Sequence, residues 1–344
     1  MNIIAVAKRA GVSTATVSRV MNGTAKVSPG TAERVREAVE ALNFYPDVNA
    51  RALGSGRSGL YGLIISDITN PYFPELVKAF EDIAVEHGQD VLIANTDYDP
   101  KRMEMCVIRM LQRKVDGVAI MTSEMEERMI HTLGQRQIPT VFMDTTGEGR
   151  AASTVAVDYK GGITDAMQHL FRLGHKEIAF ISGPLTLGSA RARAEAFQAA
   201  LREHGFKMRP GWLQESDHRV EGGHHAMKRI LESGSLPTAV LGSNDLTAIG
   251  AMGAIHGRGL DIPGDISVIG FDDIELSGYT LPGLTTMRVP RRELASTAFR
   301  ALFRGREATP AKGRRMRQHV IKTTLVVRGS TGSVPANLKV RSGG

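Results

Sequence analysis

Apolar residues recur at every third or fourth position between Ile3 and Met21, and the pattern is interrupted at Gly11. This spacing is typical of amphipathic helices, so we predict two short helices that meet at a tight turn. Ser13 suits the N-cap of the second helix, because its hydroxyl can accept a hydrogen bond from a backbone N–H of the first turn. A third helix is predicted after Ser28, another suitable N-cap, with Pro29 at its first position.

A different pattern begins after residues 55–60, which have the glycine- and serine-rich composition of a linker. Short apolar runs typical of strands alternate with longer runs at helical spacing, first within residues 61–160 and again within residues 161–289. Alternation in two blocks predicts an α/β fold with two doubly wound lobes, each built on a parallel sheet. We expect these ranges to form an N-terminal and a C-terminal lobe.

The first two predicted helices match a helix-turn-helix, in which the second helix enters the major groove of DNA. Thr14 and Ala15 would face the bases, with Arg19 one turn further on. Thr and Ala can contact the thymine methyl group, and Arg favours guanine. Hydroxyl side chains that suit phosphate contacts or capping are Ser13, Thr16 and Ser18. A helical hairpin packed on another surface is the alternative, but these polar side chains would pack poorly.

Charge is distributed unevenly over the 344 residues, whose net charge is +7. Residues 1–60 contain 8 Lys and Arg against 4 Asp and Glu, and residues 61–299 contain 24 against 31. Residues 300–344 contain 11 against 1. A basic head suits a phosphate backbone, whereas the acidic body does not. The basic C-terminal segment has no role that the sequence explains.

Composition excludes several classes of protein. No run approaches the ~20 apolar residues of a membrane helix, and the N-terminus lacks the apolar stretch of a secretory signal, so we expect a cytoplasmic protein. The single cysteine, Cys106, can form neither an intrachain disulfide nor a multi-cysteine metal site. Neither a dinucleotide-binding glycine turn nor a nucleophile elbow is found. We predict no metal, no cofactor and no enzymatic activity.

A resemblance to the LacI/GalR family of transcriptional regulators is carried by AVAKRAGVSTATVSRVMNG and by KVSPGTAERVREAVEALNFYPDVNARAL, and it continues through almost the whole chain. It implies a DNA-binding headpiece over residues 1–45 and a hinge helix over residues 46–54. In that hinge, Leu53 would wedge into the minor groove together with its dimer partner and kink the DNA. The DNA-contacting residues we expect are Ser13, Thr14, Ala15, Thr16, Ser18, Arg19, Asn22, Asn49, Ala50 and Leu53.

The same resemblance implies a periplasmic-binding-protein-like body. The chain would cross back near Thr286–Pro290, so that residues 290–330 rejoin the N-terminal lobe. Residues 331–344 are expected to form a disordered tail. No heptad repeat like that of tetrameric relatives follows residue 330, so we expect a homodimer on a pseudo-palindromic operator.

Polar and aromatic side chains follow the predicted strands, at the ends where ligands bind in open α/β sheets. Two facing lobes would place these side chains around a cleft. Carboxylates, amides and Arg can bind vicinal hydroxyls, and aromatic rings can cover apolar sugar faces. The effector-binding residues we expect are Asn70, Tyr72, Phe73, Asp144, Ser189, Arg193, His218, Asn244 and Asp272. For Tyr72 and Phe73 a core position is the alternative, and Asp245 and Asp273 could simply cap helices.

The resemblance places Arg193, Asn244 and Asp272 where sugar-responsive members hold effector hydroxyls. His218 falls where many members have an aromatic residue, which leaves the ligand open. Leu187 stands where a purine-responsive relative has Arg, so we favour a sugar or sugar acid and keep a purine or nucleoside co-repressor as the alternative. The sequence therefore predicts an effector-controlled repressor of carbohydrate-metabolism genes. A solute-binding protein is a distant alternative, because it would carry an export signal and no headpiece.

Overall fold

The computed structural model describes residues 2–23, 27–45, 57–122, 127–144, 153–307 and 318–334. The chain divides into two compact units, Met1–Gly59 and Leu60–Gly344. The predicted hinge helix over residues 46–54, with Asn49, Ala50 and Leu53, lies outside the described residues. So do residues 308–317, the central part of the basic C-terminal segment.

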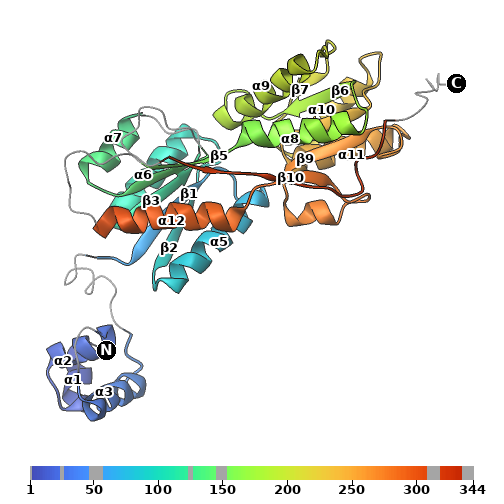
Figure 1. The fold of residues 1–344 in the computed structure, drawn as a ribbon. Helices are drawn as coiled ribbons and strands as arrows, with labels where there is room; N and C mark the ends of the chain where they lie inside the picture. The colour runs from blue at the N-terminus through green and yellow to red at the C-terminus, as the bar shows by residue number, and fades with distance from the viewer. Residues whose placement is uncertain are drawn as a thin grey trace. The chain divides into compact units, whose positions relative to one another are not determined.

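The first unit is a bundle of three helices, α1 (Ile3–Ala10), α2 (Thr14–Asn22) and α3 (Pro29–Ala41) (Figure 1). Its core contains Val6, Val17 and Val35, which are fully buried. The turn between α1 and α2 requires Gly11, whose φ of 64° lies in the left-handed region. Its N–H donates to carbonyls of the last turn of α1, which satisfies that helix end.

The second unit contains two lobes, each with a six-stranded sheet. The N-terminal lobe has the strand order β11-β5-β4-β3-β1-β2, with all pairs parallel. Its strands are β1 (Leu60–Ile65), β2 (Asp90–Asn95), β3 (Gly117–Met121), β4 (Thr140–Met143), β5 (Ser153–Val157) and β11 (Gln318–Ile321). Its helices are α5 (Tyr72–Glu86), α6 (Pro100–Gln112), α7 (Glu127–Gln135) and α12 (Arg291–Glu307).

The C-terminal lobe has the strand order β12-β10-β9-β8-β6-β7, and β12 is antiparallel to β10. Its strands are β6 (Ile178–Ser182), β7 (Leu213–Glu215), β8 (Ala239–Gly242), β9 (Ser267–Asp272), β10 (Thr285–Arg288) and β12 (Thr324–Val326). Its helices are α8 (Tyr159–Arg172), α9 (Gly188–Glu203), α10 (Val220–Leu231), α11 (Asp245–Gly257) and the short 3₁₀ helix η1 (Glu275–Gly278).

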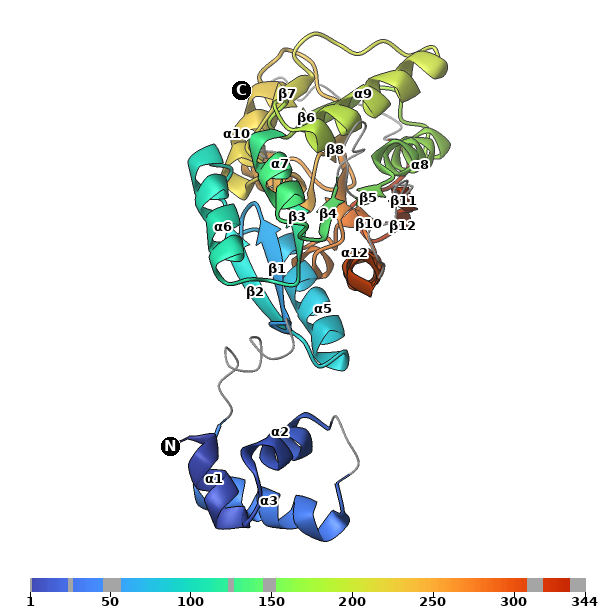
Figure 2. The same ribbon diagram turned by 90° about the vertical axis from the view of Figure 1, so that its left-hand side faces the viewer.

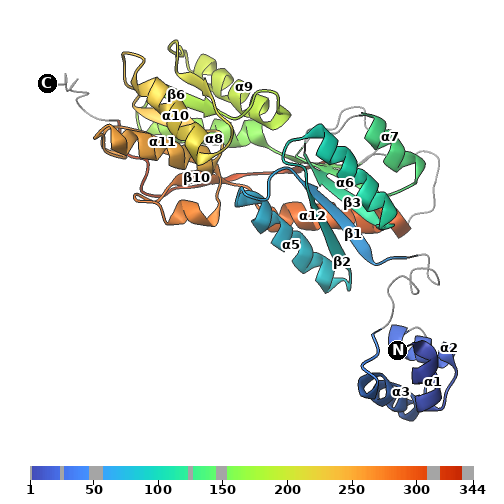
Figure 3. The same ribbon diagram turned by 180° about the vertical axis from the view of Figure 1, so that it is seen from behind.

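Each sheet is covered by helices on both faces. In β1, Leu63 packs in the core beneath α5 and α12, while the next residue, Ile64, packs beneath α6 and α7 (Figure 2). In the C-terminal lobe α8 and α9 cover one face, and α10 and α11 cover the other (Figure 3). Strands buried on both faces are apolar throughout, which explains the continuous apolar runs in the sequence.

Three segments connect the lobes: the chain passes from β5 to α8, from β10 to α12 and from β11 to β12. The last of these is the dark red segment that runs between the lobes in Figure 1. The assignment of all of residues 290–330 to the N-terminal lobe is therefore wrong after Ile321. Within this range β11 pairs with β5 in the N-terminal lobe, whereas β12 pairs with β10 in the C-terminal lobe. A three-residue strand takes its partner from tertiary contacts rather than from its own pattern.

The start of the predicted tail is also ordered. The Val334 N–H donates to the Leu173 carbonyl (2.9 Å), and Gly332 O lies 2.9 Å from His175 Nε2. Residues 331–334 thus pack on the C-terminal lobe, contrary to the expectation of disorder, and residues 335–344 lie outside the described part. The sequence patterns also did not reveal β5 and β7, which are short and lie at or near sheet edges.

Candidate functional site

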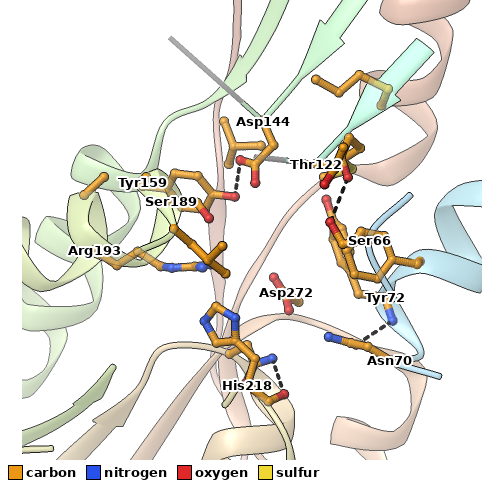
Figure 4. A pocket seen from close by; sticks show the side chains of 18 of the residues that line it. Ser66, Asn70, Tyr72, Thr122, Asp144, Tyr159, Ser189, Arg193, His218 and Asp272 are labelled. Atoms are coloured by element: carbon orange, nitrogen blue, oxygen red, sulfur yellow. Dashed lines mark hydrogen bonds between the residues drawn. The ribbon is translucent and has the colours of Figure 1, made fainter. Parts of the chain in front are cut away.

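A cavity of about 470 Å³ opens between the two lobes of the second unit (Figure 4). The structure brings all of the predicted effector-binding residues to its walls: Asn70, Tyr72, Phe73, Asp144, Ser189, Arg193, His218, Asn244 and Asp272. They come from both lobes and from six strand ends or helix starts. The strand-end positions and the family resemblance together therefore selected residues that line one cavity, although Asn70 and Asp272 are about 200 positions apart.

The wall from the N-terminal lobe is largely apolar. Tyr72 and Phe73 begin α5 and are nearly buried, with their ring centroids 5.5 Å apart in an edge-on arrangement. Asn70 Oδ1 accepts a hydrogen bond from the Tyr72 N–H (3.1 Å), which positions the start of this helix. Met121 and Met143, at the ends of β3 and β4, complete the wall. Both aromatic residues thus belong to the core and also line the cavity.

The opposite wall is polar and contains a buried cation. Arg193 on α9 is 4% exposed, and its guanidinium carbon lies 4.5 Å from the centroid of the Tyr159 ring and 5.4 Å from that of Phe271. Its Nε makes no hydrogen bond to any described residue. An unsatisfied buried donor costs free energy, so this N–H is available to a ligand that enters the cavity.

Asp144 bridges the lobes at one end of the cavity. Its carboxylate, at the end of β4, accepts a hydrogen bond from the hydroxyl of Tyr159, at the start of α8 (Figure 4). Burial raises the pKa of Asp144 to about 6, although Tyr159, Arg193 and Ser189 act to lower it. A second contact across the lobes joins Arg219 Nη2 to Asp67 Oδ2 (3.2 Å).

Asp272, at the end of β9, has a φ of 109°, which is unfavourable for any residue with a side chain. Strain of this kind costs on the order of 1–3 kcal/mol and persists only where surrounding contacts impose it. Burial raises the pKa of Asp272 to about 7, while Arg193 and Arg291 lower it. Its carboxyl group thus titrates near neutral pH on the cavity wall.

Asp245 and Asp273, for which helix capping is the alternative role, are not the N-caps of helices. Asn244 is the N-cap of α11, where its Oδ1 accepts the Thr247 N–H (2.9 Å). Asp245 is buried behind it and accepts the Thr286 hydroxyl (2.5 Å) and the Ile274 N–H (2.8 Å). Burial alone would raise the pKa of Asp273, but hydrogen bonds from Arg288 and Arg328 outweigh it and the pKa is lowered.

His218 is held as a neutral imidazole. Burial, with a smaller contribution from Arg193, lowers its pKa to about 3. Its Nε2 lies 3.1 Å from Ser243 Oγ, and its carbonyl accepts the Asn244 side-chain amide (3.0 Å). A Cβ at Gly183 would lie 1.8 Å from His218 Nε2. The glycine at this position is therefore explained by close packing against His218.

Several residues on the cavity wall were not expected from the sequence. They are Ser66, Tyr98, Met121, Thr122, Met143, Ala156, Val157, Tyr159, Thr186, Gly188, Arg191 and Ala192. Tyr159 matters most, because it contacts both Asp144 and Arg193. It follows β5, so recognition of that strand would have identified it by the same strand-end argument.

In the first unit, α2 presents the side chains expected at DNA. Thr14, Ala15 and Arg19 are exposed, whereas Val17 on the other side of the helix is buried. Ser13 Oγ accepts the Thr16 N–H (3.2 Å) and caps the helix. Thr16 and Ser18 are half-buried. Asn22 ends α2, and its side chain lies outside the described part of the structure.

Comparison with known proteins identifies both units. Residues 2–47 match the bacterial regulatory proteins of the lacI family, and residues 167–331 match a periplasmic binding protein-like domain. Catabolite control protein A of Priestia megaterium is 34% identical over 303 residues, which are 88% of this chain and 91% of that protein. The chain belongs to the lacI family. It is therefore a DNA-binding transcriptional repressor, and the family is one of regulators rather than enzymes.

Other lacI-family members support this assignment. The transcriptional repressor PurR of Glaesserella parasuis is 36% identical over 299 residues, 87% of this chain and 88% of that protein. The crystal structure of the Lac repressor dimer bound to operator and the anti-inducer ONPF matches with a TM-score of 0.86 and 29% identity, over 96% of this chain and 99% of that one. A CelR–cellobiose complex matches with a TM-score of 0.72 and 26% identity, again over 96% of this chain and 99% of that one.

The predicted fold class, a three-helix headpiece with two α/β lobes on parallel sheets, is confirmed. Among the described residues, no helix is long and apolar enough to cross a membrane. The described part of the chain also contains no group of three or more His, Cys, Asp or Glu side chains that could hold a metal ion.

Proposed function

We propose that this lacI-family repressor binds a neutral sugar in the interlobe cavity and that the sugar controls its affinity for the operator. The observation that carries the proposal is the contrast between the two walls. The polar wall offers the buried Asp272 carboxylate and the unpartnered Nε of Arg193, and Asp144 adds a second carboxylate from the end of β4 in the other lobe. These groups suit hydroxyls that both donate and accept. The apolar wall, with Tyr72 and Phe73, suits the C–H face of a sugar ring.

The charge of the cavity favours a neutral sugar over a sugar acid. Asp144 and Asp272 provide two carboxylates near Arg193, and His218 stays neutral. Arg191 and Arg193 balance these two carboxylates once both are ionised, so the wall offers no excess of positive charge. An anionic effector would therefore find no spare cation to pair with, in a place where water screens charge poorly.

A purine co-repressor is the second candidate, and the similarity to PurR proteins supports it. Against it, the side chain of Leu187, which lines the cavity, offers no hydrogen bond to a purine ring. The CelR structure, described as a cellobiose complex, supports a sugar.

The test is a thermal-shift screen of the full-length protein with neutral mono- and disaccharides, sugar acids and purine bases. A neutral sugar should raise Tm, because a ligand at 100 times its Kd stabilises the folded state by about 2.7 kcal/mol. Asp272→Ala should abolish that shift, whereas the exposed control Asp165→Ala should retain it. A shift with a purine base alone would replace the sugar with a purine co-repressor.

For the operator, we propose that α2 enters the major groove. Thr14, Ala15 and Arg19 would contact the bases, which agrees with the exposure of these three side chains. Ser13, Thr16 and Ser18 would contact phosphates. Contacts by Asn22, Asn49, Ala50 and Leu53 stay predictions. The proposed targets are carbohydrate-metabolism genes, which the protein would control by binding a pseudo-palindromic operator.

We further propose that the protein acts as a homodimer. Effector binding would change the closure of the lobes, which would change the separation of the paired hinge segments and the joint grip of two headpieces on DNA. A difference in effector affinity between the two states worth ~1–3 kcal/mol is sufficient. The exposed apolar residues Leu276, Tyr279 and Leu281 provide a surface for dimerisation.

A further inference from the structure

Two ion pairs join helices α5 and α12 of the N-terminal lobe, and they differ in burial. Arg292 Nη2 lies 3.0 Å from Glu86 Oε1, and these side chains are 68% and 56% exposed. Arg291 Nη2 lies 2.6 Å from Glu75 Oε2, and these side chains are 17% and 28% exposed. The second pair is thus largely withdrawn from solvent, and its Glu75 stands in the first turn of α5, next to the cavity-lining Tyr72 and Phe73.

Arg291 and Glu75 also reach across to the C-terminal lobe. Arg291 donates from Nη1 to the Asp272 carbonyl (2.7 Å) and from Nη2 to the Asp273 carbonyl (2.8 Å). Glu75 Oε1 accepts the Glu275 N–H (3.0 Å). The planar guanidinium suits this use, because its donors can serve a carboxylate and two carbonyls at once. Three hydrogen bonds therefore join one Arg–Glu pair to a single turn of the other lobe.

That turn carries Asp272 and is conformationally strained. Asp272 and Asp273 have φ angles of 109° and 55°, both in the region that favours glycine. Further contacts hold the turn from within the C-terminal lobe. Arg288 Nε, at the end of β10, and Arg328 Nη2, which follows β12, each lie 2.6 Å from the Asp273 carboxylate. The position of the Asp272 carboxylate thus depends on contacts at the junction of the two lobes.

We propose that Glu75 and Arg291 form an interlobe clasp that couples the position of Asp272 to closure of the cleft. They are positioning residues, since Arg291 contacts the backbone of the turn rather than the cavity. An effector that pulls on the Asp272 carboxylate would pull α5 and α12 with it through the clasp. This proposal rests on the proposed function only where it treats Asp272 as an effector ligand. The effect of the clasp on cleft closure can be measured without any effector.

The test measures the width of the cleft in the full-length, ligand-free protein. Spin labels are attached at Lys101→Cys, on α6, and Glu221→Cys, on α10, in a Cys106→Ser background, and their separation is measured by double electron–electron resonance. Both labelled positions are exposed, and the nearby contact between Arg219 and Asp97 (3.9 Å) shows that these helices begin on opposite sides of the cleft. Glu75→Gln should raise the ratio of open to closed molecules at least about 5-fold.

Glu86→Gln is the matched control, because it breaks an Arg–Glu pair between the same two helices without reaching the other lobe. Its distance distribution should equal that of the parent. Arg291→Lys is a second variant, which keeps the charge but cannot serve all three acceptors, and it should also open the cleft. A change in Tm with no change in the distance distribution, for both Glu75→Gln and Arg291→Lys, would reduce the clasp to a structural contact and overturn the proposal. Failure of the sugar screen leaves this measurement unaffected.

Discussion

Burial sets the ionisation of three side chains on the cavity wall. It raises the pKa of Asp144 to about 6 and that of Asp272 to about 7, and it lowers the pKa of His218 to about 3. The imidazole therefore stays neutral throughout the physiological range, while Asp272 changes charge within it. The electrostatic character of the cavity depends on these two acids, and pH changes near 7 act mainly on Asp272.

This leads to a prediction for stability. A raised pKa means that the folded protein holds the Asp272 proton more tightly than the unfolded chain does, so the free energy of unfolding falls as pH rises from about 4 to about 7. The slope from this one group is at most about 1.4 kcal/mol per pH unit. Asp272→Asn has no carboxyl group to titrate, so it does not lose this part of the free energy of unfolding as pH rises. Its Tm relative to the parent should therefore increase between pH 5 and pH 8, measured by differential scanning calorimetry.

The exposed Asp82→Asn serves as the control for this pH series, because Asp82 pairs with Lys78 on the surface of α5. Its Tm difference from the parent should not follow the same rise. A flat Asp272→Asn difference across this pH range would show that the carboxyl group does not titrate near 7.

At the scale of elements, the N-caps of α2 and α3 in the headpiece differ, although both are serines in the sequence. Ser13 and Ser28 both stand at the N-cap, as predicted. Ser13 Oγ accepts the Thr16 N–H, but the Ser28 side chain makes no such bond and donates to the Thr31 hydroxyl instead (2.9 Å). Pro29 already removes one unsatisfied donor from the first turn of α3. The two serines therefore differ in what they contribute.

Ser13→Ala should destabilise α2 by about 1 kcal/mol, the usual value of an N-cap side chain. In hydrogen–deuterium exchange of the full-length protein, amides of residues 14–22 should then exchange about 5-fold faster. Ser28→Ala is the matched control and should change the exchange of α3 much less. Equal effects of the two substitutions would mean that the Ser13 hydrogen bond has no special weight.

At the scale of the whole molecule, apolar surface is exposed beside the clasp. Tyr279 and Leu281, which follow η1, are 74% and 88% exposed, and Leu276 is about half exposed. Contiguous exposed apolar residues mark sites of association more often than lone ones do. The Glu75–Glu275 hydrogen bond links this region to α5, so a dimer formed here would lie next to the lobe junction.

The dimer proposal predicts that Leu281→Ser raises the dimer dissociation constant at least about 10-fold, because burial of a leucine side chain contributes about 1.5–3 kcal/mol. Sedimentation velocity over a concentration series measures this change. Val320→Ser is the control, since Val320 is also exposed but lies on the edge strand of the other lobe. If Leu281→Ser left the sedimentation profile unchanged, the dimer would form on another surface.

Local sequence patterns determined much of this protein. The spacing of apolar residues predicted the three helices of the headpiece, and the alternation of strands and helices predicted both lobes. The strand-end positions and the family resemblance together selected residues such as Arg193 and Asp272, which the fold brings to one cavity. The fold prediction is confirmed because helix and strand periodicity are local. The selected residues meet because parallel strands place their carboxyl ends at one edge of a sheet, and their role as effector ligands stays a prediction.

Tertiary structure alone decided the contacts between distant segments. The bond from Tyr159 to Asp144 and the reach of Arg291 to the Asp272 turn join residues of different lobes. The pairing of β12 with β10 joins segments that are far apart in the sequence within the C-terminal lobe. The pKa values on the cavity wall depend on burial that both lobes create together. No local pattern encodes such properties, because each arises from how closely two separately predicted elements approach in three dimensions.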